Sequence, residues 1–345
     1  MRILVLHAWL KGNLGDVLQL SVLLSALRDL QPTRLDLAGY PDQPAPETAE
    51  VIERVDRYLP DTFPWYWKLA PSLVGRIVFE PWWRRRRTAL FSGYDAIVSA
   101  PGPYLADYDP RATSALADIA IAADMGLRVV LASHSIGPLS AAGQTVIARA
   151  TARIARESST FEYLRERGIS SVLAADLAFL YGYTPAGAPD GLRPPYRLVF
   201  LRSNNLKARR LRLDRGALFE GARQIADASS DPVVLATSDY RRDARFLAHA
   251  AGTLGVPWVP CRSVQDMVRL VAASSSVVSD RYHPAICAAV LGKPARILSN
   301  REPHKMRGLA NLLADHTVED LQTLARSGLR AVQRALHVAA AGSAS

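Results

Sequence analysis

The sequence predicts an α/β protein made of two Rossmann-like, doubly wound domains, and three observations support this. The chain has 345 residues, enough for two domains at roughly 150 residues each. Short apolar runs alternate with helix-like runs along its length, a pattern typical of parallel sheets covered by helices. A run rich in glycine and proline at 181–195 separates two such series and predicts a linker.

The first series predicts an N-terminal domain over residues 1–180. Strands of the buried type are expected at 3–6, 33–38, 96–99, 127–132 and 171–174. Helices are expected at 16–30, where apolar residues recur at 17, 20, 24 and 27, and also at 114–123 and 142–157.

The second series predicts a C-terminal domain over 196–325. Its expected strands are 197–201, 232–236, 276–279 and 295–298, and its expected helices are 215–228, 240–254, 264–273 and 283–291. A further helix is expected over about 318–338, and we set residues 326–345 apart as terminal helix and tail. In such folds ligands bind at the carboxyl ends of the strands, so we expect a cleft between the two domains.

The composition indicates an anionic partner. Lysine and arginine number 42 against 32 acidic residues, a net charge of +10, and hydrophobic residues make up 49%, which excludes a mainly disordered chain. Cys261 and Cys287 form no C-x-x-C pair, which argues against a disulfide framework or a structural zinc site. No apolar run reaches the roughly 18 residues of a spanning helix. We therefore expect a cytoplasmic protein, with peripheral contact at the inner membrane face as an addition.

A glycine turn follows the first strand and leads into a helix. It contains Asn13, Gly15 and Asp16. Glycine allows the backbone to approach a ligand closely, and the free N–H groups of a helix start favour an anion. Neither a dinucleotide fingerprint nor a P-loop is present. The alternative is that Asp16 merely caps the helix after a tight turn.

A second motif lies where the strand 276–279 meets the next helix. Pro284 suits the first helical turn and Gly292 suits the helix end, so Arg281 and His283 are expected at a helix N-terminus. Helix dipole and guanidinium both favour an anion there, and a histidine transfers protons near neutral pH. The alternative is that Arg281 pairs with a carboxylate and His283 caps the helix.

Two more cations are candidates by position. Arg202 follows the strand 197–201, and Lys305 follows the last predicted strand. With Asn13, Asp16, Arg281 and His283, both would face the expected cleft. The arginine run at 209–215 is interpreted as a solvated basic face.

A segment at about 62–90 is rich in tryptophan and arginine and interrupts the first domain. It includes the membrane-facing candidates Trp82, Trp83, Arg84 and Arg85. Tryptophan beside arginine favours a bilayer interface with anionic lipids. A segment packed on the protein is the bland alternative, and nucleic acid would use the same residue types, although no nucleic-acid motif is present.

Six short segments, in order along the chain, resemble the polysaccharide pyruvyl transferase family. They are Gly12-Asn-Leu-Gly-Asp16, Ser135-Ile-Gly-Pro-Leu139, Arg156-Glu-Ser-Ser159, Asp176-Leu-Ala-Phe179, Ser279-Asp-Arg-Tyr-His283 with Gly292-Lys-Pro294, and Lys305 with Gly308-Leu309. The resemblance implies a two-lobed architecture like that of GT-B glycosyltransferases, phosphoenolpyruvate as donor substrate and a saccharide acceptor. It also implies that Arg281 and His283 contact the donor. We expect no cofactor, and no metal is required if arginines neutralise the anionic donor.

Two segments depart from the family pattern. Ala100-Pro-Gly-Pro-Tyr104 stands where the family has a glycine cluster, and Ser133-His-Ser135 stands where it has G-Q-G. Both would lie on the acceptor side, so His134 becomes a candidate acceptor-binding residue, with a structural histidine as the alternative.

The predicted function is therefore a pyruvyltransferase that forms a pyruvate ketal on a saccharide, with a lipid-linked or cell-surface glycan precursor as the expected acceptor. His283 is the expected general acid, and Asp16 is expected to orient the acceptor or act as base. Two alternatives stay open. One is a GT-B glycosyltransferase with a nucleotide-sugar donor, and the other is a non-enzymatic, basic membrane- or nucleic-acid-binding protein.

Overall fold

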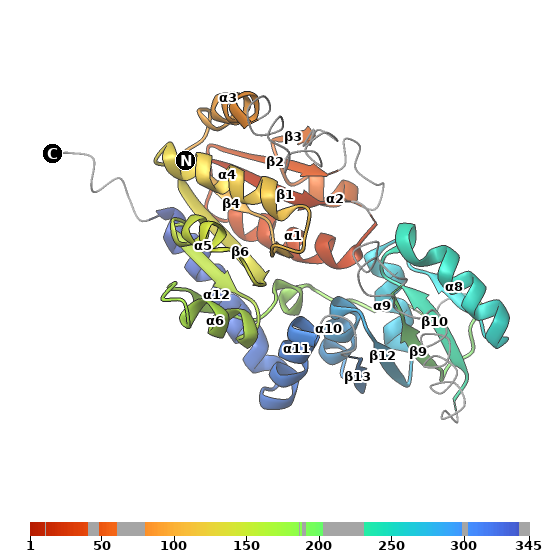
Figure 1. The fold of residues 1–345 in the computed structure, drawn as a ribbon. Coiled ribbons are helices and arrows are strands. Elements are labelled where there is room, and N and C mark those ends of the chain that lie inside the picture. Colours follow the sequence, from red (N-terminus) through yellow and green to blue (C-terminus); the bar gives the residue numbers. More distant parts are fainter. Residues whose placement is uncertain are drawn as a thin grey trace. The chain divides into compact units, whose positions relative to one another are not determined.

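A computed structural model describes residues 1–10, 12–40, 48–60, 80–185, 187, 191–202, 231–298 and 303–337 (Figure 1). The chain forms two compact units. The first holds residues 1–10, 19–177 and the chain from residue 322 onward, and the second holds residues 11–18 and 178–321. The helix expected at 215–228, the arginine run at 209–215 and residues 61–79 of the tryptophan-rich segment lie outside the described residues.

The first unit contains a parallel sheet in the order β3-β2-β1-β4-β6-β7-β8, with β5 paired to β6. The chain runs outward from β1 on one side and then crosses to β4 on the other. The neighbouring strands β1 and β4 therefore mark the point where the direction of winding reverses. The strands are β1 Arg2–Trp9, β2 Arg34–Tyr40, β3 Arg57–Pro60, β4 Ala96–Ser99, β5 Gly102–Leu105, β6 Arg128–Ile136, β7 Ala152–Ala155 and β8 Val172–Leu173.

The helices of this unit follow the strands in alternation. They are α1 Leu14–Arg28, whose first residues belong to the second unit, α2 Ala49–Ile52, α3 Glu80–Phe91, α4 Ala112–Asp124, α5 Ala141–Ala148, α6 Ser158–Arg165 and the C-terminal α12 Val318–His337. A short 3-10 helix, Leu177–Leu180, lies at the boundary: Leu177 belongs to the first unit and the residues after it belong to the second. Helix α12 packs on this unit: Gln333 donates to the Ala26 carbonyl at 3.0 Å, and a Cβ on Gly328 would lie 2.7 Å from that of Ala174.

The helix predicted at 142–157 is wrong in its second half. Helix α5 ends at Ala148, and the chain then enters strand β7 at Ala152. The Thr151 amide donates to the Val129 carbonyl at 2.7 Å, and Ile154 is buried. Pairing of β7 with both β6 and β8 thus overrides the helical preference of an alanine-rich run. Ladder bonds and burial outweigh propensity differences of a few tenths of a kcal/mol per residue.

The second unit contains a smaller parallel sheet in the order β11-β10-β9-β12-β13. Its strands are β9 Arg197–Phe200, β10 Val233–Thr237, β11 Trp258–Pro260, β12 Ser276–Ser279 and β13 Ala295–Ile297, and its helices are α8 Tyr240–Leu254, α9 Val264–Ala273, α10 Tyr282–Val290 and α11 Pro303–Asp315. The predicted helices 240–254 and 264–273 are confirmed residue for residue. Ser263 and Asp266 form a capping box that starts α9.

The grouping of residues differs from the linear boundaries we expected at two places. Residues 11–18 join the second unit because Leu14 donates its amide to the Ser238 carbonyl at 2.9 Å and Asn13 forms an antiparallel bridge with Asp239. The residues from 322 onward join the first unit through α12. Both differences arise from contacts between segments that are far apart in sequence.

Candidate functional site

The second sheet places three loops at one reversal point. Strand β9 lies between β10 and β12, and the chain winds first to one side of β9 and then to the other. Ligands of doubly wound sheets bind at the carboxyl ends of the strands beside such a point. The residues found there are Arg202 after β9, Ser238 and Asp239 after β10, and Asp280 and Arg281 after β12.

Arg281 directly precedes helix α10 and is held by two buried carboxylates. Its guanidinium contacts Asp243, and its Nη1 lies 3.9 Å from Oδ2 of Asp239. Its backbone amide donates to the Ser279 hydroxyl at 2.9 Å. Its Nε has no hydrogen-bond partner among the described residues. The expectation that Arg281 stands at a helix N-terminus is confirmed, and so is the alternative that it pairs with a carboxylate.

His283 lies in the first turn of α10, and only 6% of its surface is exposed. Its ring packs edge-on to Tyr282, with centroids 5.5 Å apart. A Cβ added to Gly15 would overlap the imidazole at Nδ1 and Cγ. The structure therefore brings together the two motifs that the sequence singled out, and glycine at position 15 makes room for the histidine ring.

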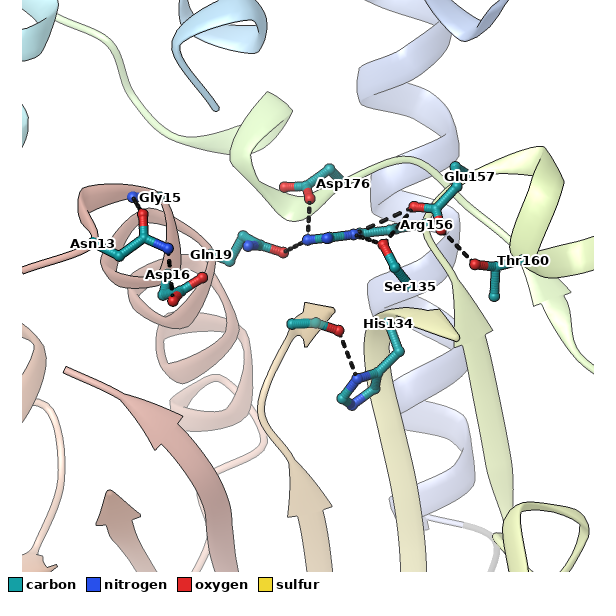
Figure 2. Close-up of polar contacts among 11 residues, drawn as sticks. Asn13, Gly15, Asp16, Gln19, His134, Ser135, Arg156, Glu157, Thr160 and Asp176 are labelled. Atoms are coloured by element: carbon teal, nitrogen blue, oxygen red, sulfur yellow. Dashed lines mark hydrogen bonds and ion pairs between the residues drawn. The ribbon is translucent and has the colours of Figure 1, made fainter. Parts of the chain in front are cut away.

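The side chain of Asn13 bonds to both Gly15 and Asp16 in the turn before α1 (Figure 2). The Asn13 Nδ2 donates to Oδ2 of Asp16 at 2.8 Å, and its Oδ1 accepts from the Gly15 amide at 3.3 Å. Asp16 is the third residue of the helix. The alternative that Asp16 caps α1 is wrong, because the side chain that accepts an amide proton at the helix start is Asn13.

Asp239 is a site residue that sequence reasoning missed. It has no exposed surface, and burial raises the pKa of its carboxyl to about 6; Asp243 and Asp16 raise this pKa as well, while Arg281 and Arg242 lower it. The available signal was its position two residues after the buried strand β10, close to the carboxyl end of that strand, as Asp280 is close to the carboxyl end of β12.

The two other predicted cations belong to the same unit. The Arg202 amide donates to Oδ2 of Asp280 at 3.1 Å, and the residue is half-buried. The Lys305 Nζ lies 4.9 Å from the ring centre of Tyr282, within range of a cation–π interaction. That these groups face a cleft between the domains stays a prediction.

His134 lies in the first unit and has no exposed surface. Its Nδ1 is 3.1 Å from the Gly102 carbonyl and its Nε2 is 3.3 Å from the Ser99 carbonyl. Burial lowers its pKa to about 3, with smaller lowering effects from His7 and Arg156. The ring is therefore neutral at physiological pH. The expectation that His134 contacts the acceptor is corrected here: its buried ring belongs to the core, as the structural alternative had it.

Arg156 forms the centre of a buried ion cluster in the same unit (Figure 2). Its Nη1 donates to Asp176 at 3.0 Å and to Gln19 at 3.1 Å, while its Nε donates to Ser135 at 2.7 Å. Glu157 lies 3.3 Å from the same Nε. Three of the six matching sequence segments thus meet at one side chain, which gives them a structural role in this unit.

The expectation that Trp83 faces a membrane is wrong. Its indole is 2% exposed, donates to Asp118 at 3.2 Å, and packs against Arg87, whose Cζ is 4.1 Å from the ring centre. The same helix leaves Trp82 41% exposed. Arg84 and Arg85 are also exposed, and Arg84 pairs with Asp124 at 2.7 Å. One side of helix α3 is therefore packed against the protein, as expected from the alternative of a segment packed on the protein.

A family model described as polysaccharide pyruvyl transferase matches residues 13–302. The chain belongs to the polysaccharide pyruvyl transferase family. It is a transferase of polysaccharide biosynthesis that acts with a donor substrate and a saccharide acceptor. No curated protein sequence matches the chain.

Solved structures support the fold assignment for this pyruvyl transferase family member. A UDP-N-acetylglucosamine 2-epimerase from Rickettsia bellii superimposes with a TM-score of 0.59 at 12% identity, over 97% of this chain and 96% of that one. The UDP-GlcNAc 2-epimerase from Neisseria meningitidis, bound to UDP-GlcNAc, gives 0.55 at 11% identity over 97% and 99%. A glycosyltransferase from Rickettsia africae gives 0.57 at 10% identity over 98% and 99%. The predicted GT-B-like fold with two Rossmann-like domains is confirmed.

Within the part of the chain that the structure describes, no cluster of three or more histidine, cysteine, aspartate or glutamate side chains is arranged to hold a metal ion. The same residues contain no helix with both the length and the apolar character that crossing a bilayer requires.

Proposed function

We propose that this transferase moves the pyruvyl group of phosphoenolpyruvate onto two hydroxyls of a saccharide, forming a pyruvate ketal and releasing phosphate. The observation that carries the proposal is the placement of Arg281 and His283. Both stand at the N-terminus of α10, at the reversal point of the second sheet, with His283 against Gly15.

The donor is an anion with a phosphate and a carboxylate, and this site offers it positive groups. The first amides of α10 carry the positive end of the helix dipole. Arg281 still has an Nε–H that no described residue accepts. Arg202 and Lys305 are in the same unit and add two further charges. A planar guanidinium suits the bidentate recognition of either anionic group.

The reaction balances without an additional reactant. His283, as imidazolium, donates a proton to the methylene carbon of the donor, which becomes a methyl group. A hydroxyl oxygen of the saccharide then bonds to the adjacent carbon, the bond from that carbon to the phosphate oxygen breaks, and a second hydroxyl closes the ketal. One of the two hydroxyl protons restores His283, and the other leaves on phosphate. Asp16 orients the hydroxyls or accepts their protons, and Asn13 holds its carboxylate at 2.8 Å.

The test measures phosphate release from phosphoenolpyruvate in the presence of saccharide acceptors. His283→Asn should lower the rate at least 100-fold, a typical contribution of general acid catalysis, while His249→Asn on the exposed face of α8 should leave it unchanged. Arg281→Lys tests the guanidinium, with Arg269→Lys as its exposed control. Lysine keeps the charge that Asp239 and Asp243 need, whereas alanine would leave two buried carboxylates uncompensated.

Full activity in His283→Asn would overturn the assignment of the acid. Consumption of a nucleotide sugar without any use of phosphoenolpyruvate would replace the proposal by the glycosyltransferase alternative.

We also propose that the acceptor is lipid-linked and that the protein meets it in the cytoplasm, at the inner membrane face. Trp82 and Arg86 support this, because they lie on the exposed side of α3 with the guanidinium 5.5 Å from the indole centre. Trp82→Ala with Arg85→Ala and Arg86→Ala should lose flotation with anionic vesicles. Arg326→Ala with Arg330→Ala removes two exposed charges from α12 as a control. Unchanged flotation of the triple variant would refute this contact.

A further inference from the structure

Asp239 occupies the position before α8, where an aspartate ordinarily accepts a hydrogen bond from its own helix. It makes no such bond here: no side-chain cap is formed, and neither carboxylate oxygen accepts a hydrogen bond from any residue the structure describes. Its backbone amide donates instead to the Thr237 hydroxyl at 2.9 Å. Without the capping hydrogen bond, the folded protein lacks about 1 kcal/mol of stabilisation that an aspartate at a helix start ordinarily provides. Full burial of the carboxylate adds a desolvation cost.

The carboxylate lies beside Arg281, although that guanidinium already has a partner. Oδ2 of Asp239 is 3.9 Å from Nη1 of Arg281 and 3.6 Å from Nε of Arg242, which is itself 40% exposed. Asp243 contacts Arg281 directly, and Asp16 adds a further negative charge nearby. Arg281 is therefore the buried cation for two buried carboxylates. The Asp243 carboxylate accepts a hydrogen bond from the Thr237 hydroxyl, whereas the Asp239 carboxylate accepts none from the described residues.

We propose that Asp239 is a proton-linked counter-ion of Arg281: when the anionic donor takes the guanidinium, the Asp239 carboxylate takes up one proton from solvent. This inference rests on the proposed function, because it needs an anion at Arg281. Asp239 acts through Arg281, so it is a positioning residue that sets the pH range in which the donor binds.

The proton uptake follows from electrostatics. An anion bound at Arg281 neutralises the charge that lowers the pKa of Asp239, and it places a new negative charge beside the carboxylate. Both changes favour the protonated acid. By linkage, a site that takes up a proton on binding loses affinity as pH rises above the pKa of the free carboxyl, here about 6.

This linkage predicts a difference between the wild type and Asp239→Asn, whose neutral side chain needs no proton. At pH 6 the two should bind the donor within about twofold of each other. The variant should bind about tenfold more tightly at pH 7 and up to about 100-fold more tightly at pH 8, since each pH unit above the free pKa weakens the wild type tenfold. The donor phosphate also titrates near pH 6, but its titration is common to both proteins and cancels in the comparison.

The experiment is calorimetric titration with phosphoenolpyruvate in two buffers of different ionisation enthalpy, from pH 6 to pH 8. The wild type should take up as much as one proton more than Asp239→Asn at pH 7 and above, and exposed Asp315→Asn should behave as the wild type. Asp239→Ser provides a second neutral variant, and thermal melts verify folding. Equal proton counts and parallel pH dependence would overturn this inference alone. Absence of binding in every protein at every pH would overturn the proposed donor and this inference together.

Discussion

The two sheets reverse their winding in the same way, yet the two reversal points carry opposite chemistry. At the first, between β1 and β4, buried polar groups bond to one another: His7 Nδ1 lies 2.8 Å from the Ser99 hydroxyl, which lies 2.8 Å from the Tyr104 hydroxyl. At the second, between β9 and β12, the carboxylate oxygens of Asp239 and the Nε of Arg281 have no hydrogen-bond partner among the described residues. A polar cluster that satisfies itself stabilises a fold, whereas one left open is suited to a ligand.

The first cluster also shows how a familiar constellation can be structural. His7 lies between Ser99 and Asp118, with Nε2 3.3 Å from the Asp118 carboxylate, an arrangement similar to a nucleophilic triad. Ser99 has no exposed surface, however, and Tyr104 closes the chain by donating to the Ala100 carbonyl at 2.6 Å. No substrate carbonyl can reach such a hydroxyl. The triad geometry here belongs to packing.

The backbone of the first cluster is strained at two positions. His7 has φ 63° and Ser133 has φ 54°, both in the left-handed region that non-glycine residues rarely adopt. Each lies at a register shift, in β1 against β2 and in β6 against β7. These irregularities turn side chains at the carboxyl ends of the strands, and the rings of His7 and His134 pack edge-on to Tyr104 at 5.6 and 5.1 Å.

The largest expected effect is on the acid stability of the first cluster. Between pH 6.5 and about 3 the unfolded chain binds a proton at His134 that the folded protein does not, so the free energy of unfolding falls as pH falls through this window. Glutamine does not titrate in this range and still reaches a carbonyl. In His134→Gln the free energy of unfolding should therefore fall by several kcal/mol less between neutral and acidic pH than in the wild type. Urea titrations from pH 7 to pH 4 measure it, with exposed His249→Gln as the control. An unchanged pH slope would contradict a neutral, buried His134.

The second cluster should respond in the opposite sense. Between the ordinary value of 3.8 and about 6 the folded protein keeps a proton at Asp239 that the unfolded chain has released, so stability falls as pH rises and levels off above pH 6. Asp239→Asn should therefore be more stable than the wild type by up to about 3 kcal/mol at pH 8 and similar to it at pH 4. Equal stability of the two proteins at pH 8 would show that Asp239 is well solvated in the free protein.

The smallest expected effect, in kcal/mol, comes from a substitution at Gly15, and it is an effect on activity. Alanine favours a helix by about 1 kcal/mol over glycine, so Gly15→Ala should fold, yet its methyl group must displace the His283 ring. Activity should fall about 100-fold, or about 2.7 kcal/mol. Gly252→Ala in α8 meets open space and serves as the matched control. Normal turnover in a folded Gly15→Ala protein would separate His283 from the reaction.

Regions with strong local patterns were predictable from sequence. Helices α8 and α9 and strands β4 and β12 match the predicted bounds, because apolar periodicity and capping residues act within a few positions. The motifs around Gly15 and His283 were recognised by residue type and spacing. Strand β7 was misassigned, since alanine-rich segments carry little information about which neighbour they pair with, and Trp83 was placed at a surface because its neighbours on α3 are charged.

The amino-acid sequence by itself determined the α/β class, the order of most elements and the family. Only the tertiary structure decided which polar side chains meet. Arg281 lies beside both Asp243 and Asp239. Arg156 contacts Asp176 and Gln19, and His134 is fully buried in the first unit. The reason is physical. Periodicity and capping are local properties, whereas desolvation and ion pairing depend on residues that approach from distant parts of the chain.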